Sequence, residues 1–148
     1  MSESDYQERL AKEGEVWGRV AAADAEVMAP DWRFHRTLRH NAIMHTADID
    51  SLLACIRPGM AALEVGCGPG WLTLAMAQQG ADAHGIDISR DAIQIARDYY
   101  DSIRDTVSGH ASYEVADLNR ITLPPEKYDV VVGKGVLHHL PEAAHLLD

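Results

Sequence analysis

The pattern of apolar and polar residues changes at about residue 57. Beyond it, short apolar runs alternate with longer segments of helical periodicity, which is typical of strands separated by helices. The run 60–65 is apolar except for Glu64, as expected of a strand buried on both faces. The predicted strands are 60–65, 83–88, 112–116 and 128–132, and the predicted helices are 71–79, 90–103 and one that begins near Pro141. This alternation predicts an α/β fold with a mostly parallel sheet and helices on both faces.

The residues before Arg57 have a different pattern. Segments 6–27 and 33–56 have helical character, are separated by Ala29-Pro30-Asp31, and contain no strand candidate. We therefore expect two parts, a helical cap or lid over residues 1–56 and an α/β domain over residues 57–148.

Composition narrows the class of protein. The chain has 148 residues, of which 47% are hydrophobic, and this is enough for one core. Its formal net charge of -10 repels phosphate backbones and anionic lipids, so nucleic-acid and membrane partners are disfavoured. The acidic N-terminus lacks the features of a signal peptide, which favours a cytoplasmic location. The two cysteines, Cys55 and Cys67, form no metal-binding motif, so we expect reduced thiols and no metal site.

A glycine-rich loop follows the first predicted strand. Gly66, Gly68 and Gly70 lie where a buried strand leads into a helix, and there a ligand can approach the backbone closely. Asp87 lies 21 residues after Gly66, at the end of the second predicted strand. An acid at this distance accepts hydrogen bonds from ribose hydroxyls in nucleotide-binding βαβ units. The spacing therefore predicts an adenosine site.

The loop also indicates which adenosine compound binds. Its spacing departs from the G-x-G-x-x-G pattern of dinucleotide sites, because Trp71 follows Gly70 directly. The negative charge of Glu64 is unfavourable beside a pyrophosphate and favourable beside a ligand with an ammonium and a sulfonium group. S-adenosyl-L-methionine fits this pattern best, and an NAD(P)-dependent oxidoreductase is the alternative.

Three segments together resemble the class I S-adenosylmethionine-dependent methyltransferases over residues 57–148. They are LEVGCGPGWLTLAMAQQGADAHGIDIS, YEVADLN and YDVVVGKGVLHHL. The resemblance implies that the methionine end of the cofactor is bordered by Glu64, Gly66, Gly68, Gly133 and Lys134, and that Gly70 also belongs to the cofactor site. It also implies that Asp87 holds the ribose, Ile88 lies against adenine, Asp117 accepts from the adenine amine, and the Leu118 N–H meets a ring nitrogen.

The resembling family has a seven-stranded sheet of order 3-2-1-4-5-7-6, and this sequence contains candidates for the first four strands. The resemblance thus implies a Rossmann-like sheet of order 3-2-1-4 and a fragment of a longer protein, without most of the acceptor pocket. The strand 128–132 then forms a free edge, at which we expect self-association.

Several other residues or segments are interpreted as structural, and for most of them a functional role is the alternative. Cys67 is interpreted as a small buried residue because no motif provides a base for it. His138 and His139 are given a structural role, with a general base as the alternative. Segment 31–45, which carries Arg33, Arg36 and Arg39, is either an exposed helix face or a lid that binds an anion. Trp17 and Trp32 either close over a pocket or pack the cap on the sheet.

The predicted activity is methyl transfer to a small molecule. Gly133-Lys134-Gly135-Val136 replaces the (Asn/Asp)-Pro-Pro-aromatic loop with which related enzymes hold planar nitrogens. Methyl transfer is an in-line displacement that needs mainly alignment and exclusion of water, so no catalytic residue is assigned. A second alternative is a non-catalytic module that binds S-adenosylmethionine and needs a partner to complete its sheet.

Overall fold

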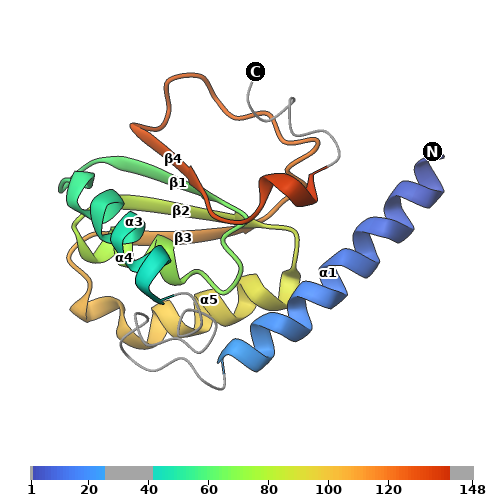
Figure 1. Cartoon of the computed structure of the whole chain (residues 1–148), viewed down its shortest axis with the longest axis horizontal. Helices are drawn as coiled ribbons and strands as arrows, with labels where there is room; N and C mark the ends of the chain where they lie inside the picture. Colours follow the sequence, from blue (N-terminus) through green and yellow to red (C-terminus); the bar gives the residue numbers. More distant parts are fainter. Residues whose placement is uncertain (1, 26–41, 141–148) are drawn as a thin grey trace.

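In the computed structural model, which describes residues 2–25 and 42–140, four strands form one parallel sheet (Figure 1). The strands are β1 (Ala61–Val65), β2 (Asp82–Asp87), β3 (His110–Val115) and β4 (Val130–Gly133). Their order is β3-β2-β1-β4, and every neighbouring pair is parallel. The predicted fold class and strand order are confirmed.

The helices are α1 (Glu3–Ala25), α3 (Ala42–Cys55), α4 (Trp71–Gln78) and α5 (Arg90–Ile103), with two 3-10 turns at Arg104–Thr106 and Leu137–His139. Ser89 caps α5 as predicted, since its hydroxyl accepts from the Ala92 N–H at 3.2 Å. Arg33, Arg36, Arg39, Trp32 and the helix expected near Pro141 lie outside the described residues.

The fourth strand begins two residues later than predicted. Asp129 exchanges two hydrogen bonds with Ala61, one through its backbone N–H and one through its carboxylate, each 2.8 Å long. The preceding residue, Tyr128, lies outside β4, and its hydroxyl is 2.9 Å from Nδ1 of His84 on β2. The start of β4 is set by hydrogen bonds with β1, which is distant in the sequence. The pattern of residues 128–132 alone therefore did not reveal it.

The two faces of the sheet are covered differently. α4 and α5 pack on one face over an apolar core that includes Ala62, Ala83, Met76, Ile93 and Tyr113. On the other face, Leu63, Val65, Ile86 and Leu118 are covered by residues of the segments 116–128 and 136–140. In the part of the chain that the structure describes, helices cover the first face, and the cover of the second face is irregular except for the turn Leu137–His139.

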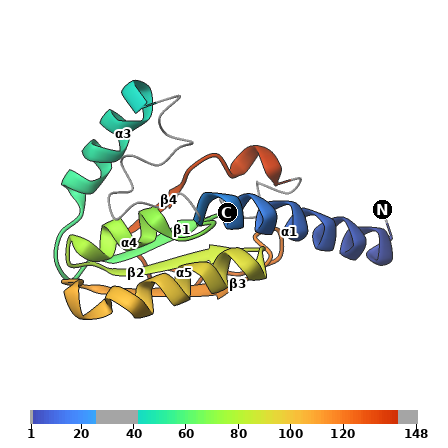
Figure 2. The same cartoon turned by 90° about the horizontal axis from the view of Figure 1, so that it is seen from below.

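α1 packs along α5 and lies beside one end of the sheet (Figure 2). Two glycines one helical turn apart, Gly14 and Gly18, face the junction between β2 and α5. A Cβ atom on Gly18 would lie 2.8 Å from a carboxylate oxygen of Asp91, so glycine permits the close approach. No helix within residues 2–25 and 42–140 has the length and hydropathy needed to cross a bilayer.

Candidate functional site

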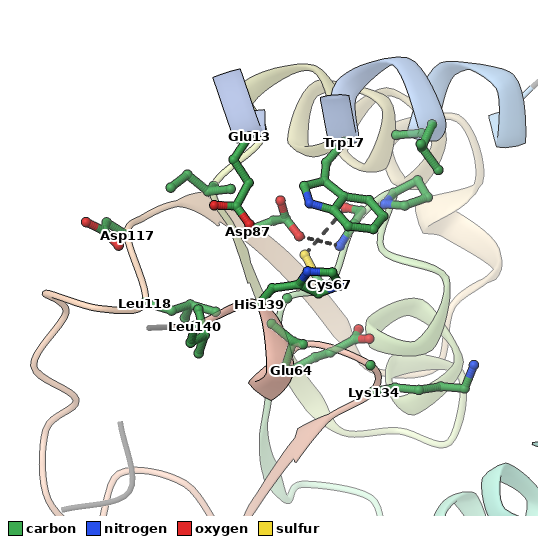
Figure 3. Close-up of a pocket in the computed structure, with 18 of the residues that line it drawn as sticks. Glu13, Trp17, Glu64, Cys67, Asp87, Asp117, Leu118, Lys134, His139 and Leu140 are labelled. Carbon is green, nitrogen blue, oxygen red and sulfur yellow. Dashed lines mark hydrogen bonds between the residues drawn. The ribbon is translucent and has the colours of Figure 1, made fainter. Parts of the chain in front are cut away.

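A cavity of about 230 Å³ lies where the ends of the strands meet α1 (Figure 3). Its walls include eight of the ten residues expected from the sequence: Glu64, Gly66, Gly68, Asp87, Ile88, Asp117, Leu118 and Lys134. Residues far apart in the sequence thus meet at one place, as the carboxyl ends of parallel strands do in α/β proteins. Gly70 and Gly133 lie outside the walls.

The glycine loop after β1 serves two purposes. Gly68 has a φ of +51°, and a Cβ atom there would meet no other atom within 4 Å, so its backbone borders open space. Gly70, with a φ of +79°, would instead place a Cβ against Tyr113 and Ala96. Gly70 therefore allows the loop to pack on α5 and β3 and lies outside the cavity walls, and its contact with the cofactor stays a prediction.

Gly133 ends β4 and has a similar packing role. A Cβ on Gly133 would lie 2.8 Å from a methyl group of Val65 and 3.0 Å from one of Val136. Its two successors, Lys134 and Gly135, line the cavity in its place. The ammonium group of Lys134 lies 5.5 Å from the ring centre of Trp71, a cation–π contact at the mouth of the glycine loop.

Asp87 joins the end of β2 to the glycine loop. Its Oδ2 accepts from the Gly68 N–H at 2.8 Å, and its Oδ1 accepts from the Ser89 N–H at 2.8 Å. A carboxylate has about four lone-pair sites, so both oxygens retain acceptor capacity toward the cavity. The geometry is suitable for accepting hydrogen bonds from hydroxyl groups.

Glu64 is buried beneath the N-terminus of α4, with 2% of its surface exposed. Its Oε2 accepts from the Thr73 N–H at 2.7 Å and from the Thr73 hydroxyl at 2.5 Å. Burial raises the pKa of Glu64 to about 8, although the hydrogen bonds from Thr73 oppose the shift, and the negative charge of Asp87 adds to it. Glu64 therefore fixes α4 as well as bordering the cavity.

Asp117 follows β3, and both of its carboxylate oxygens are engaged. Oδ1 accepts from the backbone and side-chain N–H groups of Asn119 at 3.0 and 3.1 Å. Oδ2 accepts from the hydroxyl of Tyr6, on α1, at 2.6 Å. The contact with α1 was not anticipated from the sequence.

One wall of the cavity was not predicted as part of the site. α1 contributes Leu10, Glu13, Trp17, Val20 and Ala21. Their spacing of three or four residues places them on one helix face, so the sequence contained a signal. That signal did not say which surface the face covers. Trp17 lines the cavity, which agrees with the interpretation that this residue closes over a pocket.

One member of the histidine pair lines the cavity. His139 lines the cavity and makes an edge contact with Trp17, with ring centres 5.0 Å apart, whereas His138 is not part of the wall. An open groove adjoins the cavity and shares Glu13, Trp17 and His139 with it; Arg9, Lys12 and Val16 complete the groove. Cys67 is buried, as expected, and burial raises the pKa of its thiol.

A parallel sheet of order β3-β2-β1-β4, with a glycine loop after β1, one acid at the end of β2 and another after β3, is typical of a nucleotide-binding α/β domain. The family described as methyltransferase domain matches residues 62–147, more than half of the chain. The chain therefore belongs to the methyltransferase domain family.

Individual relatives agree with this assignment. Ubiquinone biosynthesis O-methyltransferase from Haemophilus ducreyi is 37% identical over 87 residues, which cover 57% of this chain and 36% of that protein. Magnesium-protoporphyrin O-methyltransferase from Rhodobacter capsulatus is 28% identical over 132 residues, which cover 89% of this chain and 56% of that protein. The chain thus spans between about a third and just over half of the length of these relatives.

A solved structure shares the fold. Magnesium protoporphyrin IX methyltransferase from Synechocystis PCC 6803, determined with bound S-adenosylmethionine, has a TM-score of 0.65 at 24% identity. The match covers 88% of this chain and 62% of that chain. The likeness therefore includes the region before β1 as well as the sheet.

Proposed function

We propose that this chain forms the S-adenosyl-L-methionine-binding part of a methyltransferase that acts on a small molecule. The observation that carries the proposal is the position of Asp87, whose carboxylate lies at the end of β2 and is bonded to Gly68 of the glycine loop. Family membership favours this function over the nicotinamide alternative. A non-catalytic module that binds S-adenosylmethionine is the second candidate, because no catalytic residue is assigned.

The cavity suits an adenosine ligand with positive charge. Among the described residues of its walls, the acidic side chains Glu13, Asp87 and Asp117 outnumber the basic side chain Lys134. Glu64 adds a carboxyl group with a raised pKa, and a bound cation would favour its charged form. In this proposal Asp87 holds the ribose hydroxyls, while Ile88 and Leu118 lie against the base. Asp117 accepts from the exocyclic amine of adenine, and the Leu118 N–H meets a ring nitrogen. Gly66, Gly68 and Lys134 border the methionine portion.

S-adenosylmethionine supplies, when bound, a methyl group on a positively charged sulfur. The protein then has to align an acceptor with that methyl group and to exclude water. The groove of Arg9, Lys12, Val16, Trp17 and His139 adjoins the cavity and gives the acceptor a route to it. Both relatives described above are named O-methyltransferases, so we propose an oxygen atom as the methylated atom.

A binding experiment tests the proposal directly. Calorimetric titration of the chain with S-adenosylmethionine, S-adenosylhomocysteine and NAD should give binding of the first two and none of the third. Tighter binding of NAD would refute the assignment. Methyl transfer by the complete gene product, screened against hydroxylated and carboxylated small molecules, distinguishes an enzyme from a binding module.

We also propose that the chain self-associates through β4. In the described part of the chain, β4 pairs with β1 along one edge only, and Val131 in its middle is 54% exposed. Free apolar strand edges pair with other chains. Light scattering should detect oligomers that Val131→Lys disperses; a monomer at every concentration would refute this. We also propose a cytoplasmic location, on the basis of the sequence alone. Fractionation of cells that produce the protein tests this proposal.

A further inference from the structure

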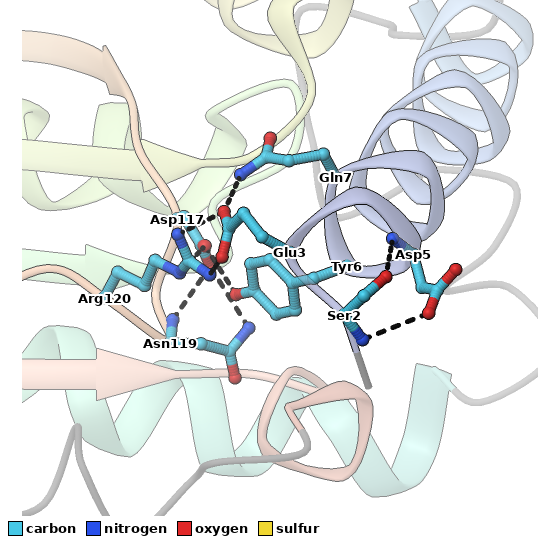
Figure 4. Close-up of polar contacts among 8 residues, drawn as sticks. All are labelled: Ser2, Glu3, Asp5, Tyr6, Gln7, Asp117, Asn119 and Arg120. Atoms are coloured by element: carbon cyan, nitrogen blue, oxygen red, sulfur yellow. Dashed lines mark hydrogen bonds and ion pairs between the residues drawn. The ribbon is translucent and has the colours of Figure 1, made fainter.

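The inference concerns the N-terminal end of α1, where four side chains connect this helix to the segment after β3 (Figure 4). The hydroxyl of Tyr6 donates to Oδ2 of Asp117 at 2.6 Å, and only 9% of the Tyr6 surface is exposed. Arg120 lies with its guanidinium carbon 4.1 Å from the centre of the Tyr6 ring. The same guanidinium donates to both carboxylate oxygens of Glu3, at 2.8 and 2.7 Å. We call Glu3, Tyr6, Asp117 and Arg120 the α1 clamp.

The clamp determines how Asp117 presents its acceptor sites. Oδ1 already accepts two hydrogen bonds from Asn119, which fills its two lone-pair directions. Oδ2 accepts one bond from Tyr6 and therefore has one direction left. Asp117 lines the cavity and Tyr6 does not, so Tyr6 acts on a ligand only through Asp117.

A competing partner explains why the hydroxyl of Tyr6 matters. Nε of Arg120 lies 3.9 Å from Oδ2 of Asp117, too far for a hydrogen bond but close enough to attract the carboxylate. The last side-chain torsion of Asp117 is soft, so the attraction of Arg120 acts to turn the carboxylate out of its present orientation. The bond from Tyr6 opposes that rotation. At the same time, Glu3 holds the guanidinium group over the Tyr6 ring.

We propose that Tyr6 is a positioning residue for base recognition, which holds Asp117 so that its one remaining acceptor site meets the exocyclic amine of adenine. This inference rests on the proposed function. It adds that α1 takes part in distinguishing adenine from bases that carry a carbonyl group at the same position. The clamp thus makes the helical cap part of the cofactor specificity.

The test compares two ligands that differ at this position. S-adenosylhomocysteine carries the amine, and S-inosylhomocysteine carries a carbonyl oxygen, which is repelled by a carboxylate acceptor. We expect the wild-type chain to bind the adenosyl compound at least tenfold more tightly. Tyr6→Phe keeps the aromatic ring over which Arg120 lies but removes the hydroxyl. It should weaken binding of the adenosyl compound by about five- to twentyfold and leave the inosyl compound within twofold.

A matched control is available outside the α1 clamp. Tyr128 also uses its hydroxyl in a side-chain contact, 2.9 Å from Nδ1 of His84, and does not line the cavity. Tyr128→Phe should leave both affinities unchanged. Glu3→Gln, at an exposed position, should lower discrimination in the same direction as Tyr6→Phe but less, because the ring and hydroxyl of Tyr6 remain.

The outcomes separate the inference from the proposed function. Equal weakening of both ligands by Tyr6→Phe would mean that α1 contributes only to structure, and this would overturn the inference while the proposed function stands. Unchanged affinities in Tyr6→Phe would overturn it as well. If the wild-type chain bound neither ligand, the proposed function and the inference would both be refuted. Circular dichroism of each variant checks that it is folded, and Glu3→Gln provides the test if Tyr6→Phe is not.

Discussion

The carboxylate of Asp87 and the backbone N–H of Gly68 are joined by a hydrogen bond of 2.8 Å. Through it, the end of β2 sets the conformation of a loop that follows β1. A second bond of the same length, from the Ser89 N–H, ties Asp87 to the start of α5. The residue assigned to ribose binding is therefore also the residue that holds the site in shape.

Replacement of Asp87 should affect both roles. Asp87→Ala removes an acceptor from the ligand and leaves the N–H groups of Gly68 and Ser89 without their partner. We expect S-adenosylmethionine binding to weaken by roughly 1.5 to 3 kcal/mol, and stability to fall by about 1 to 2 kcal/mol. Calorimetry and urea unfolding measure the two effects. Asp87→Asn, whose amide oxygen replaces one of the acceptors, should show a smaller loss of each; equal ligand affinity in all three proteins would remove Asp87 from the site.

Gly68 can be tested against a glycine with the same backbone requirement. Gly68→Val should abolish ligand binding, because its side chain would enter the cavity and a β-branched residue is strained at positive φ. Gly59 also has a positive φ, +82°, and open space around its Cβ position, but it lies in the turn before β1 and does not line the cavity. Gly59→Val should therefore cost a similar amount of stability, roughly 1 to 2 kcal/mol, and keep normal ligand binding. Loss of binding in both variants, or in neither, would contradict the assignment.

Glu64 should make stability depend on pH. Its pKa is raised from 4.5 to about 8 in the folded chain, so between these values the folded state holds a proton that the unfolded state has released. The contribution of Glu64 to stability is therefore greatest below pH 4.5 and declines as the pH rises toward 8. The urea midpoint of the wild type should fall over this window. Glu64→Gln, whose amide oxygen can accept from Thr73, should show a smaller fall, and identical profiles would contradict the prediction.

Replacement by alanine should have opposite effects on stability at the two glycines of α1. Gly14→Ala introduces only an ordinary contact, 3.7 Å from the carbonyl oxygen of Ile88, and should raise stability by up to about 1 kcal/mol through helix propensity. Gly18→Ala places its methyl group 2.8 Å from a carboxylate oxygen of Asp91, which can rotate away. The methyl group also lies 3.1 Å from Asp91 Cβ and 3.3 Å from Ser89 Oγ, so the contact between α1 and α5 has to loosen by a few tenths of an ångström. The midpoint of thermal unfolding and the affinity for S-adenosylhomocysteine should both be lower in Gly18→Ala than in Gly14→Ala. Equal behaviour of the two variants would show that the approach at Gly18 is not tight.

The parts of the fold that could be predicted are those with local causes. The apolar run before Gly66, the cap at Ser89 and the alternation of strands and helices are each contained within short stretches, and their order leads to the parallel sheet. The cover of the second sheet face was not predictable in the same way. There, segments without helical pattern bury Leu63 and Ile86, and their conformation follows from the sheet itself.

The candidate site shows the same division. Asp87 and Gly68 were predicted from the spacing between the glycine loop and the acid that ends the second strand, whereas Asp117 was predicted from the resemblance to the family. The orientation of Glu64 was not, because nothing in the sequence links it to Thr73 nine residues later. The face of α1 that includes Leu10 and Trp17 was recognisable as a helix face, but its partner is more than forty residues away in the sequence. The orientation of Glu64 and the position of α1 depend on long-range packing, which the local sequence pattern does not reveal.

The α1 clamp also bears on the order in which the molecule assembles. Tyr6 and Asp117 are 111 residues apart, and Glu3 and Arg120 are 117 apart, so the partners of α1 lie far away in the sequence. Contacts of such large sequence separation form slowly, because a long loop has to close before they stabilise anything. The strands and helices from β1 to β3 form contacts at much shorter range and can assemble before α1 docks. We therefore expect the ligand cavity to be completed late in folding, when α1 is added to a sheet that has already formed.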